Sequence, residues 1–212
     1  MKKFTLLFVI GLLMTATAFA QKPARENIPI DKQILPGFSL IVSDLDVGVV
    51  ESAMADYLAK QGLVKPGKLS GFAFYGNQNI PKIGTLHYDI YTKVVQEGKK
   101  KANKVKVYFV ATKGNMNPLT ETADREVMDK IMVFLEEFTT HARGYAVGKN
   151  VEALEKDLAK QQKQLTSATK KRDKQQSKID KMTKDLNNRQ TQIGTTQSDL
   201  NKAKMLLQQY NK

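Results

Sequence analysis

The chain has 212 residues, no cysteine and a formal net charge of +13 at pH 7. The lack of cysteine excludes disulfides, thiolate zinc sites and thiol nucleophiles, so stability must come from an ordinary apolar core and from assembly. The positive charge suits an anionic partner such as an envelope polymer or a phospholipid surface, although it can also simply keep a long helix soluble.

The first 20 residues have the pattern of a secretory signal peptide. Lys2 and Lys3 precede an apolar stretch over residues 4–17, and Ala18-Phe19-Ala20 supplies a small-x-small cleavage site. We expect cleavage after Ala20, an uncleaved anchor being the alternative. No later apolar run approaches the roughly 20 residues of a membrane span. The mature protein is therefore predicted to be periplasmic or secreted and to lack a transmembrane anchor, which makes nucleic acid an unsuitable natural partner.

Residues 21–36 contain three prolines among polar residues, which predicts an extended linker. Residues 37–146 are predicted to form an α+β domain. It begins with a strand at 38–42, followed by a helix that ends before Gly62. The apolar face of this helix consists of Val50, Ala53, Met54, Tyr57 and Leu58.

Three more strands are predicted, at residues 70–75, 83–95 and 104–112, with a loop at 76–82. Alternating apolar and polar residues predict a sheet with one face on the core and one towards water. A second helix is expected from about Leu119, and its apolar face should cover the sheet. That face consists of Val127, Ile131, Phe134, Leu135 and Phe138.

The resulting order, β-α-β-β-β-α, describes an antiparallel sheet covered by two helices. Over residues 37–142 this order of elements resembles one half of the TATA-binding-protein-like fold. The resemblance rests on topology without a sequence motif, so it implies a fold and no activity.

Residues 147–212 are predicted to form a long C-terminal coiled-coil helix. With Val151 at heptad position a, eight of nine a residues are apolar and only Arg172 departs. Such a sustained heptad repeat is typical of a coiled coil. The d positions are mixed, with Gln161, Gln175, Arg189 and Thr196 among them. The apolar residues predicted to form the contact, here called the seam, are Val151, Leu154, Leu158, Leu165, Ile179, Met182, Leu186, Ile193, Leu200 and Leu207.

Gly144 and Gly148 lie between the domain and this helix and mark a predicted hinge. Two alternatives remain open at these glycines. Either one helix continues through them with a local kink, or it ends and Asn150 caps a new one. The absence of proline favours continuity.

Chemistry-bearing patterns are sparse. His87 and Asp89 share one strand face with Tyr91, which permits a metal or proton-transfer patch but also describes an exposed polar face, and His141 is expected near a helix end. No catalytic, cofactor-binding or metal-ligating set is predicted. A basic hairpin could bind anions or protect a sheet edge from aggregation. Its lysines are Lys99, Lys100, Lys101, Lys104 and Lys106.

Together these features predict a non-enzymatic, exported cell-envelope protein. Its coiled coil would mediate oligomerisation or docking on another helical protein. The alternative is a protein that binds anionic polymers or lipid surfaces through the basic helix and the Lys99–Lys106 hairpin. A periplasmic hydrolase is a third reading, which would need a concave site that brings His87 together with acidic side chains.

Overall fold

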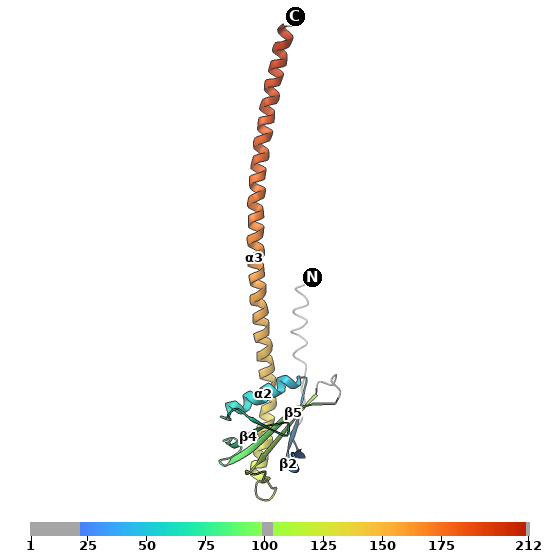
Figure 1. Ribbon diagram of the computed structural model, residues 1–212, viewed down its shortest axis with the longest axis vertical. Helices are drawn as coiled ribbons and strands as arrows, with labels where there is room; N and C mark the ends of the chain where they lie inside the picture. Colours follow the sequence, from blue (N-terminus) through green and yellow to red (C-terminus); the bar gives the residue numbers. More distant parts are fainter. Residues whose placement is uncertain (1–21, 99–103, 211–212) are drawn as a thin grey trace. The chain divides into compact units, whose positions relative to one another are not determined.

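The computed structural model describes residues 22–98 and 104–210, and the side chains of 208–210 lie outside this description. It confirms an α+β fold with a long C-terminal helix (Figure 1). The elements are β1 (Ala24–Ile30), β2 (Gln33–Ser43), α2 (Val47–Lys60), β3 (Gly67–Leu69), β4 (Phe72–Asn79), β5 (His87–Glu97), β6 (Lys104–Thr112) and α3 (Arg125–Tyr210). The predicted signal peptide lies outside the described residues.

All six strands form one antiparallel sheet in the order β1-β2-β6-β5-β4-β3. β1 and β3 are therefore the edges, and the long β6 lies between β2 and β5. The sheet contains two strands, β1 and β3, that the sequence pattern did not predict. The predicted strand bounds also shift, because β4 continues to Asn79 and β5 begins only at His87.

The prediction of an extended linker at residues 21–36 is wrong. β1 pairs with β2 along its whole length through a two-residue turn, in which Asp31 has a φ of 55°. The prolines are compatible with this hairpin because Pro29 lies on an edge strand, where a missing N–H is tolerated. Pro36 precedes the pairing of β2 with β6, which begins at Phe38.

One face of the sheet carries the main core. α2 and the first part of α3 pack on it, as the apolar faces predicted for the two helices require (Figure 1). The five residues predicted on α2 are the five that it buries. On α3, Met128 and Ala142 are buried in addition to Ile131, Phe134, Leu135 and Phe138, while Val127 is half-buried.

The opposite face of the sheet is more apolar than predicted. Val110 and Tyr91 lie on the face that was predicted to be towards water, yet both are buried in a second cluster together with Ile28, Leu35 and Phe72. The cluster forms because β1 and β2, the predicted linker, add their apolar side chains to this face. Gly37 makes room for Ile28 there: a Cβ at Gly37 would lie 2.7 Å from Ile28 Cδ1 and 2.6 Å from Val110 Cγ2.

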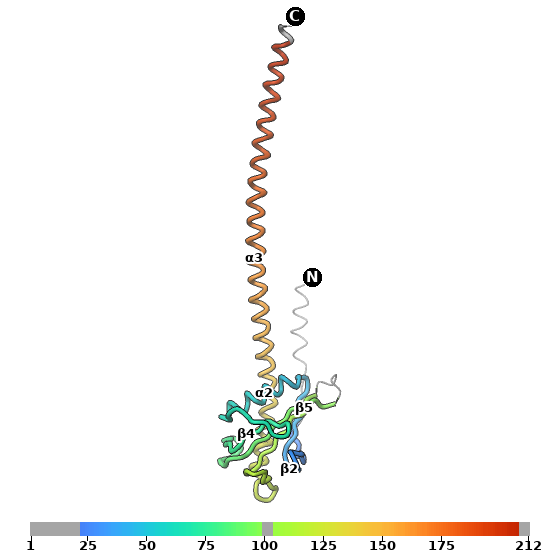
Figure 2. Tube along the Cα trace, in the orientation of Figure 1, coloured from blue at the N-terminus to red at the C-terminus, as the bar shows by residue number. Residues whose placement is uncertain are grey.

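α3 begins at Arg125, later than the predicted Leu119, because the chain forms a turn before it, closed by the hydrogen bond from the Asp124 N–H to the Thr120 carbonyl at 2.8 Å. The Asp124 carboxylate accepts the backbone N–H of Thr120 at 2.8 Å and pairs with Lys113 at 2.9 Å. The helix then runs for 86 residues, and its trace is unbroken in Figure 2. The chain divides into two compact units after Val151.

Candidate functional site

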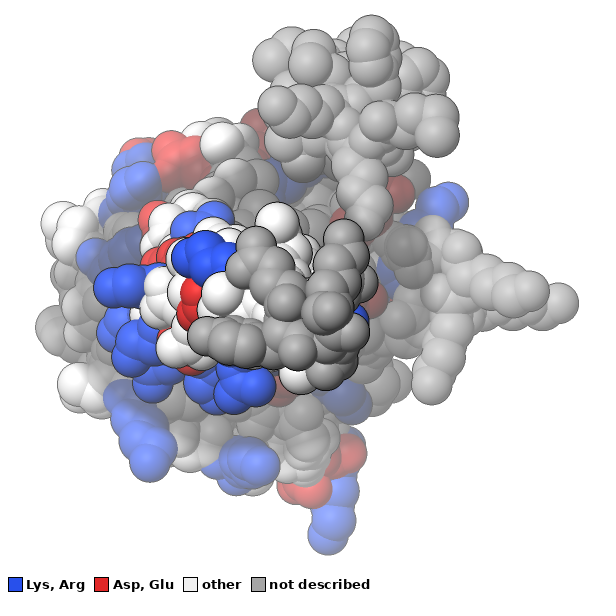
Figure 3. All heavy atoms as spheres, turned by 90° about the horizontal axis from the view of Figure 1, so that it is seen from above, with Lys and Arg blue, Asp and Glu red and all other residues white. Residues whose placement is uncertain are grey.

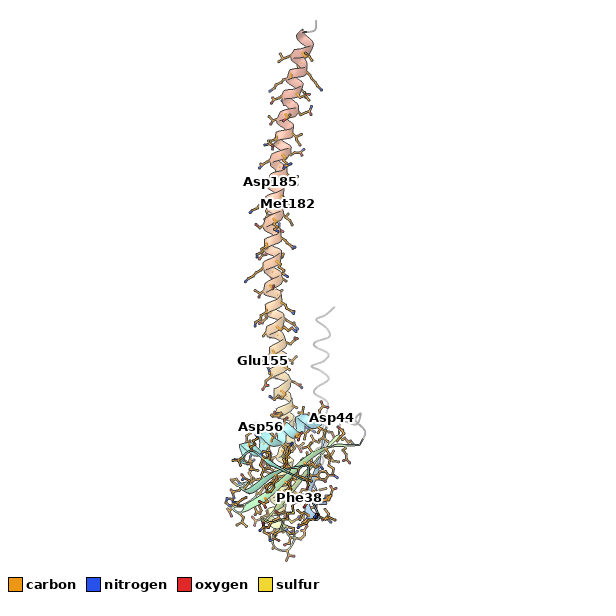
Figure 4. The ribbon with its side chains drawn as sticks, in the orientation of Figure 1. Phe38, Asp44, Asp56, Glu155, Met182 and Asp185 are labelled. Carbon is orange, nitrogen blue, oxygen red and sulfur yellow. The ribbon has the colours of Figure 1, made fainter. Side chains whose placement is uncertain are left out.

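The seam residues form a row of exposed apolar side chains along α3. All ten lie within the helix, and their side chains are between 46 and 70% exposed. Met182 lies in this row, and Figure 4 shows side chains extending to both sides of the helix near it. Core residues of the sheet domain such as Phe38 are almost completely buried. The second unit of the chain, Glu152 onward, therefore buries no core of its own.

Local interactions along α3 explain why the sequence adopts a helix there but provide little stability. Gln161 donates to Asp157 at 2.7 Å and Gln176 donates to Asp180 at 2.9 Å, each across one helical turn. Such exposed pairs contribute about 0.2–0.5 kcal/mol each. An isolated helix in water draws most of its stability from packing of an apolar face. The exposed seam is thus the part of α3 that a partner would stabilise.

The polar interruptions of the seam are accommodated within the helix itself. Arg172, the only charged a residue, donates from both Nε and Nη2 to Asp173, at 3.0 and 2.7 Å. Gln161, at a d position, is held by Asp157. Because these groups already have partners on their own helix, they can lie at the margin of a helix pair without leaving a charge wholly unpaired.

The two glycines of the predicted hinge lie inside α3. The helix passes through Gly144 and Gly148 without ending, which agrees with the alternative of continuity. A Cβ at either position would meet no neighbouring atom within 4 Å. Neither glycine is therefore required by close packing, and a role as a hinge stays a prediction.

The predicted basic patch is only partly visible. Lys99, Lys100 and Lys101 lie outside the described residues. Lys106 on β6 is not a free cation, because its Nζ lies 2.8 Å from Glu26 Oε2 and 5.0 Å from the centre of the Tyr108 ring. The hydrogen bond from Lys106 is the main reason why the pKa of Glu26 is lowered. Lys104 is exposed at the start of β6.

His87, Asp89 and Tyr91 do not form a common site. His87 is exposed, the Asp89 carboxylate accepts the backbone N–H of Asn77 at 2.8 Å, and Tyr91 is buried against Phe74. Asp89 therefore stabilises the irregular pairing of β4 with β5. Within the described ranges, no three or more His, Asp or Glu side chains gather at a spacing that could hold a metal ion.

A polar cluster between α2 and α3 was not predicted from the sequence. Tyr57 donates to Glu137 at 3.1 Å, and Lys82 pairs with the same carboxylate. His141 is not at a helix end as expected; its Nε2 lies 2.8 Å from Asp56 Oδ2. These residues come from segments far apart in the sequence, and they meet where α2 and the loop that carries Lys82 pack on α3 (Asp56 is labelled in Figure 4).

The charges in this cluster act mainly to hold the two helices together. Burial, aided by the neighbouring Glu137, raises the pKa of Tyr57, so that its hydroxyl stays protonated and donates. The hydrogen bond from Lys82 is the main cause of the lowered pKa of Glu137. An acceptor, a donor and a cation that satisfy one another in this way indicate a structural contact rather than a catalytic site.

Comparison with known protein families, with curated proteins and with solved structures finds no match to this chain. In the described part of the chain, no helix combines the length and the apolar character needed to cross a bilayer. The seam of α3 is therefore the candidate functional surface on its geometry alone.

Proposed function

We propose that this is an exported, non-enzymatic cell-envelope protein whose C-terminal helix binds a second helix through the seam. The observation that carries the proposal is the row of ten apolar side chains that stay largely exposed along α3. The prediction that the protein is exported rests on the signal-peptide pattern of residues 1–20. The positively charged surface, prominent as blue Lys and Arg in Figure 3, concerns the alternative considered below.

The free energy available from the seam is adequate for association. Full burial of one Leu or Ile side chain contributes about 1.5–3 kcal/mol. Eight apolar a residues on each helix can therefore offset an association cost of about 4–15 kcal/mol. The polar d residues reduce this gain, so a pair of moderate affinity is expected.

A second copy of the chain is the simplest partner. In a parallel pair in register, each g residue faces the e residue five positions later on the other helix. Lys171 and Lys178 at g would then face Gln176 and Thr183, which carry no charge, and Asp199 would face Lys204. The flanking positions thus permit self-association. Arg172 at an a position and Arg189 at a d position would weaken it, because both place a positive charge in the seam of each helix.

The test is the mass of the mature chain in solution. Replacing Leu186 and Ile193 by Asp places charges in the seam and should convert a dimer or larger oligomer to a monomer in light scattering. The matched control is Asn188→Asp with Thr195→Asp, two residues further along the same helix at outer c positions, and it should leave the mass unchanged.

The other outcomes are equally informative. An oligomer that survives the Leu186/Ile193 change would show that the seam is not its interface. A wild-type chain that is monomeric would rule out a second copy as partner. A pull-down with the same two variants then tests for a foreign helical protein, and retention of the same protein by both variants would overturn the proposal.

A second candidate function is binding to an anionic polymer or lipid surface. Residues 170–189 contain eight Lys or Arg against three Asp or Glu, so the positive charge of α3 is concentrated in its middle. Binding of this kind weakens strongly as salt increases, whereas burial of an apolar seam does not. Association with anionic vesicles that persists at 0.1 M salt and disappears near 1 M would favour this candidate.

A further inference from the structure

A cavity of about 350 Å³ opens between α2 and the β3–β4–β5 side of the sheet. Its floor contains a row of neighbours on three strands, because Lys68 of β3 is paired with Ala73 of β4, which is paired with Thr92 of β5. Ala73 is small, so the space above it stays empty. Adjacent strands lie about 4.8 Å apart, which places Lys68 and Thr92 on either side of that space.

Two residues that are almost completely buried, Thr92 and Tyr75, line this cavity with hydroxyl groups that have no hydrogen-bond partner among the described residues. Thr92 and Tyr75 are only 4 and 5% exposed, and both belong to the cavity wall. Among the hydrogen bonds of the described residues, none involves either side chain. Each hydroxyl can therefore pair with a polar group that enters the cavity. Burial raises the pKa of Tyr75, which keeps its hydroxyl a donor.

The rest of the lining is apolar with a charged rim. Met54 of α2 and Val94 of β5 contribute apolar surface, while Glu51 and Lys68 provide opposite charges. Lys93 also lines the cavity, but its ammonium group lies over the Phe72 ring at 5.1 Å from the ring centre. Lys68 is exposed and, among the described residues, makes no ion pair. It is thus the cation available to a ligand.

We propose that this cavity binds a small amphipathic molecule with one carboxylate and an apolar body. The carboxylate lies above Ala73, where it accepts hydrogen bonds from the Thr92 hydroxyl and the Lys68 ammonium group. The apolar body packs under α2 against Met54, Tyr75 and Val94. Glu51 at the rim disfavours ligands that carry a second negative charge. This function belongs to the sheet domain and is independent of the seam of α3.

The proposal is tested with octanoate and L-leucine as probes, titrated calorimetrically into the full mature chain. Both carry a carboxylate and an apolar body. Leucine adds an ammonium group, which would donate a hydrogen bond to the Glu51 carboxylate. Octan-1-ol is the uncharged comparison and should bind more weakly than octanoate. The preferred probe identifies the source of the ligand, fatty acid or amino acid.

Three substitutions assign the binding to the cavity. Ala73→Leu fills the space and should abolish binding. Thr92→Val keeps the shape but removes the hydroxyl, and should weaken binding tenfold or more, on the order expected for a hydrogen bond to a charged group. Lys68→Gln should weaken it roughly three- to fivefold, as for an exposed ion pair. Lys104→Gln, on β6 and outside the cavity lining, is the matched control and should change nothing.

Circular dichroism and thermal unfolding establish that each variant is folded. If Ala73→Leu does not fold, the Thr92 and Lys68 variants still decide the question. The proposal is overturned if neither probe binds at millimolar concentration, or if binding is unaffected by Thr92→Val and by a folded Ala73→Leu variant.

Discussion

At the scale of single residues, Gly37 is the position where the structure depends most directly on the lack of a side chain. It faces Val110 on β6, and Ile28 of β1 reaches across it into the second cluster. The backbone oxygen of Phe109 would lie 2.9 Å from an added Cβ, so flexible side chains alone could not relieve the clash. This glycine thus permits β1 to close over the sheet.

Gly37→Ala should therefore lower the free energy of unfolding by about 1–3 kcal/mol, the usual cost of overpacking a core. Chemical denaturation of the folded variant measures the change. Gly48→Ala on α2 is the control, because its Cβ would meet nothing within 4 Å. It should be neutral or stabilising by up to about 1 kcal/mol. Equal effects of the two substitutions would contradict the role assigned to Gly37, whereas partial rescue by adding Val110→Ala would support it.

At the scale of the elements, the regular amphipathic segments were predictable and the irregular ones were not. α2 matched its pattern because it buries one face, at a period of 3.6 residues, against the sheet. The bounds of β6 were predicted from its period of 2 residues, although Val110 on its second face is buried as well. β1 was not predicted because residues 21–36 contain three prolines, although Ile28 and Ile30 alternate as a strand requires. The short edge strand β3 carries too few residues for any periodicity.

The contacts between elements were beyond the reach of the sequence pattern. Nothing in the local sequence of Glu137 links it to Tyr57 or Lys82. Thr92 was likewise not singled out, because the space beside it depends on Ala73 of the neighbouring strand, which is paired in turn with Lys68. The seam residues lie in one continuous exposed row because a heptad repeat is encoded within one helix, and their contact with a second helix stays a prediction.

The Glu137 contact gives a pH-dependent contribution to stability. Its pKa is lowered in the folded state, chiefly by the hydrogen bond from Lys82 and also by Tyr57, from an ordinary value of 4.5. The folded state thus favours the ionised carboxylate. The stabilisation is complete above the unfolded-state pKa and is lost as the pH falls through the lower folded-state pKa.

Glu137→Gln should consequently lower the free energy of unfolding at pH 7, and the difference from wild type should shrink as the pH falls from about 6 to 3. Both side chains of the ion pair are nearly half exposed, so solvent screening limits the expected effect to about 0.5–1 kcal/mol. Denaturation curves across this pH range provide the measurement. Glu136→Gln, at an exposed neighbour, should show no such trend, and a Glu137 difference that stayed constant with pH would contradict the assignment.

At the scale of the whole molecule, the apolar core and the exposed apolar seam lie in different parts of the chain. Both apolar clusters of the sheet domain are complete before the second unit begins, since the last residue packed against them is Tyr145. The second unit has an apolar row and an excess of basic residues, but no core. Folding of the domain and association through α3 should therefore be separable.

A stop codon after Val151 tests this separation. The truncated chain should keep the unfolding free energy of the domain within about 0.5 kcal/mol, because no core contact is removed. It should also be monomeric in light scattering, since every seam residue after Val151 is gone. Octanoate or leucine binding, measured in parallel, should be unchanged because the cavity is lined by residues 51–94. A truncated domain that unfolds would show that α3 beyond Val151 stabilises the sheet, and a truncated domain that still oligomerises would place the interface on the sheet domain.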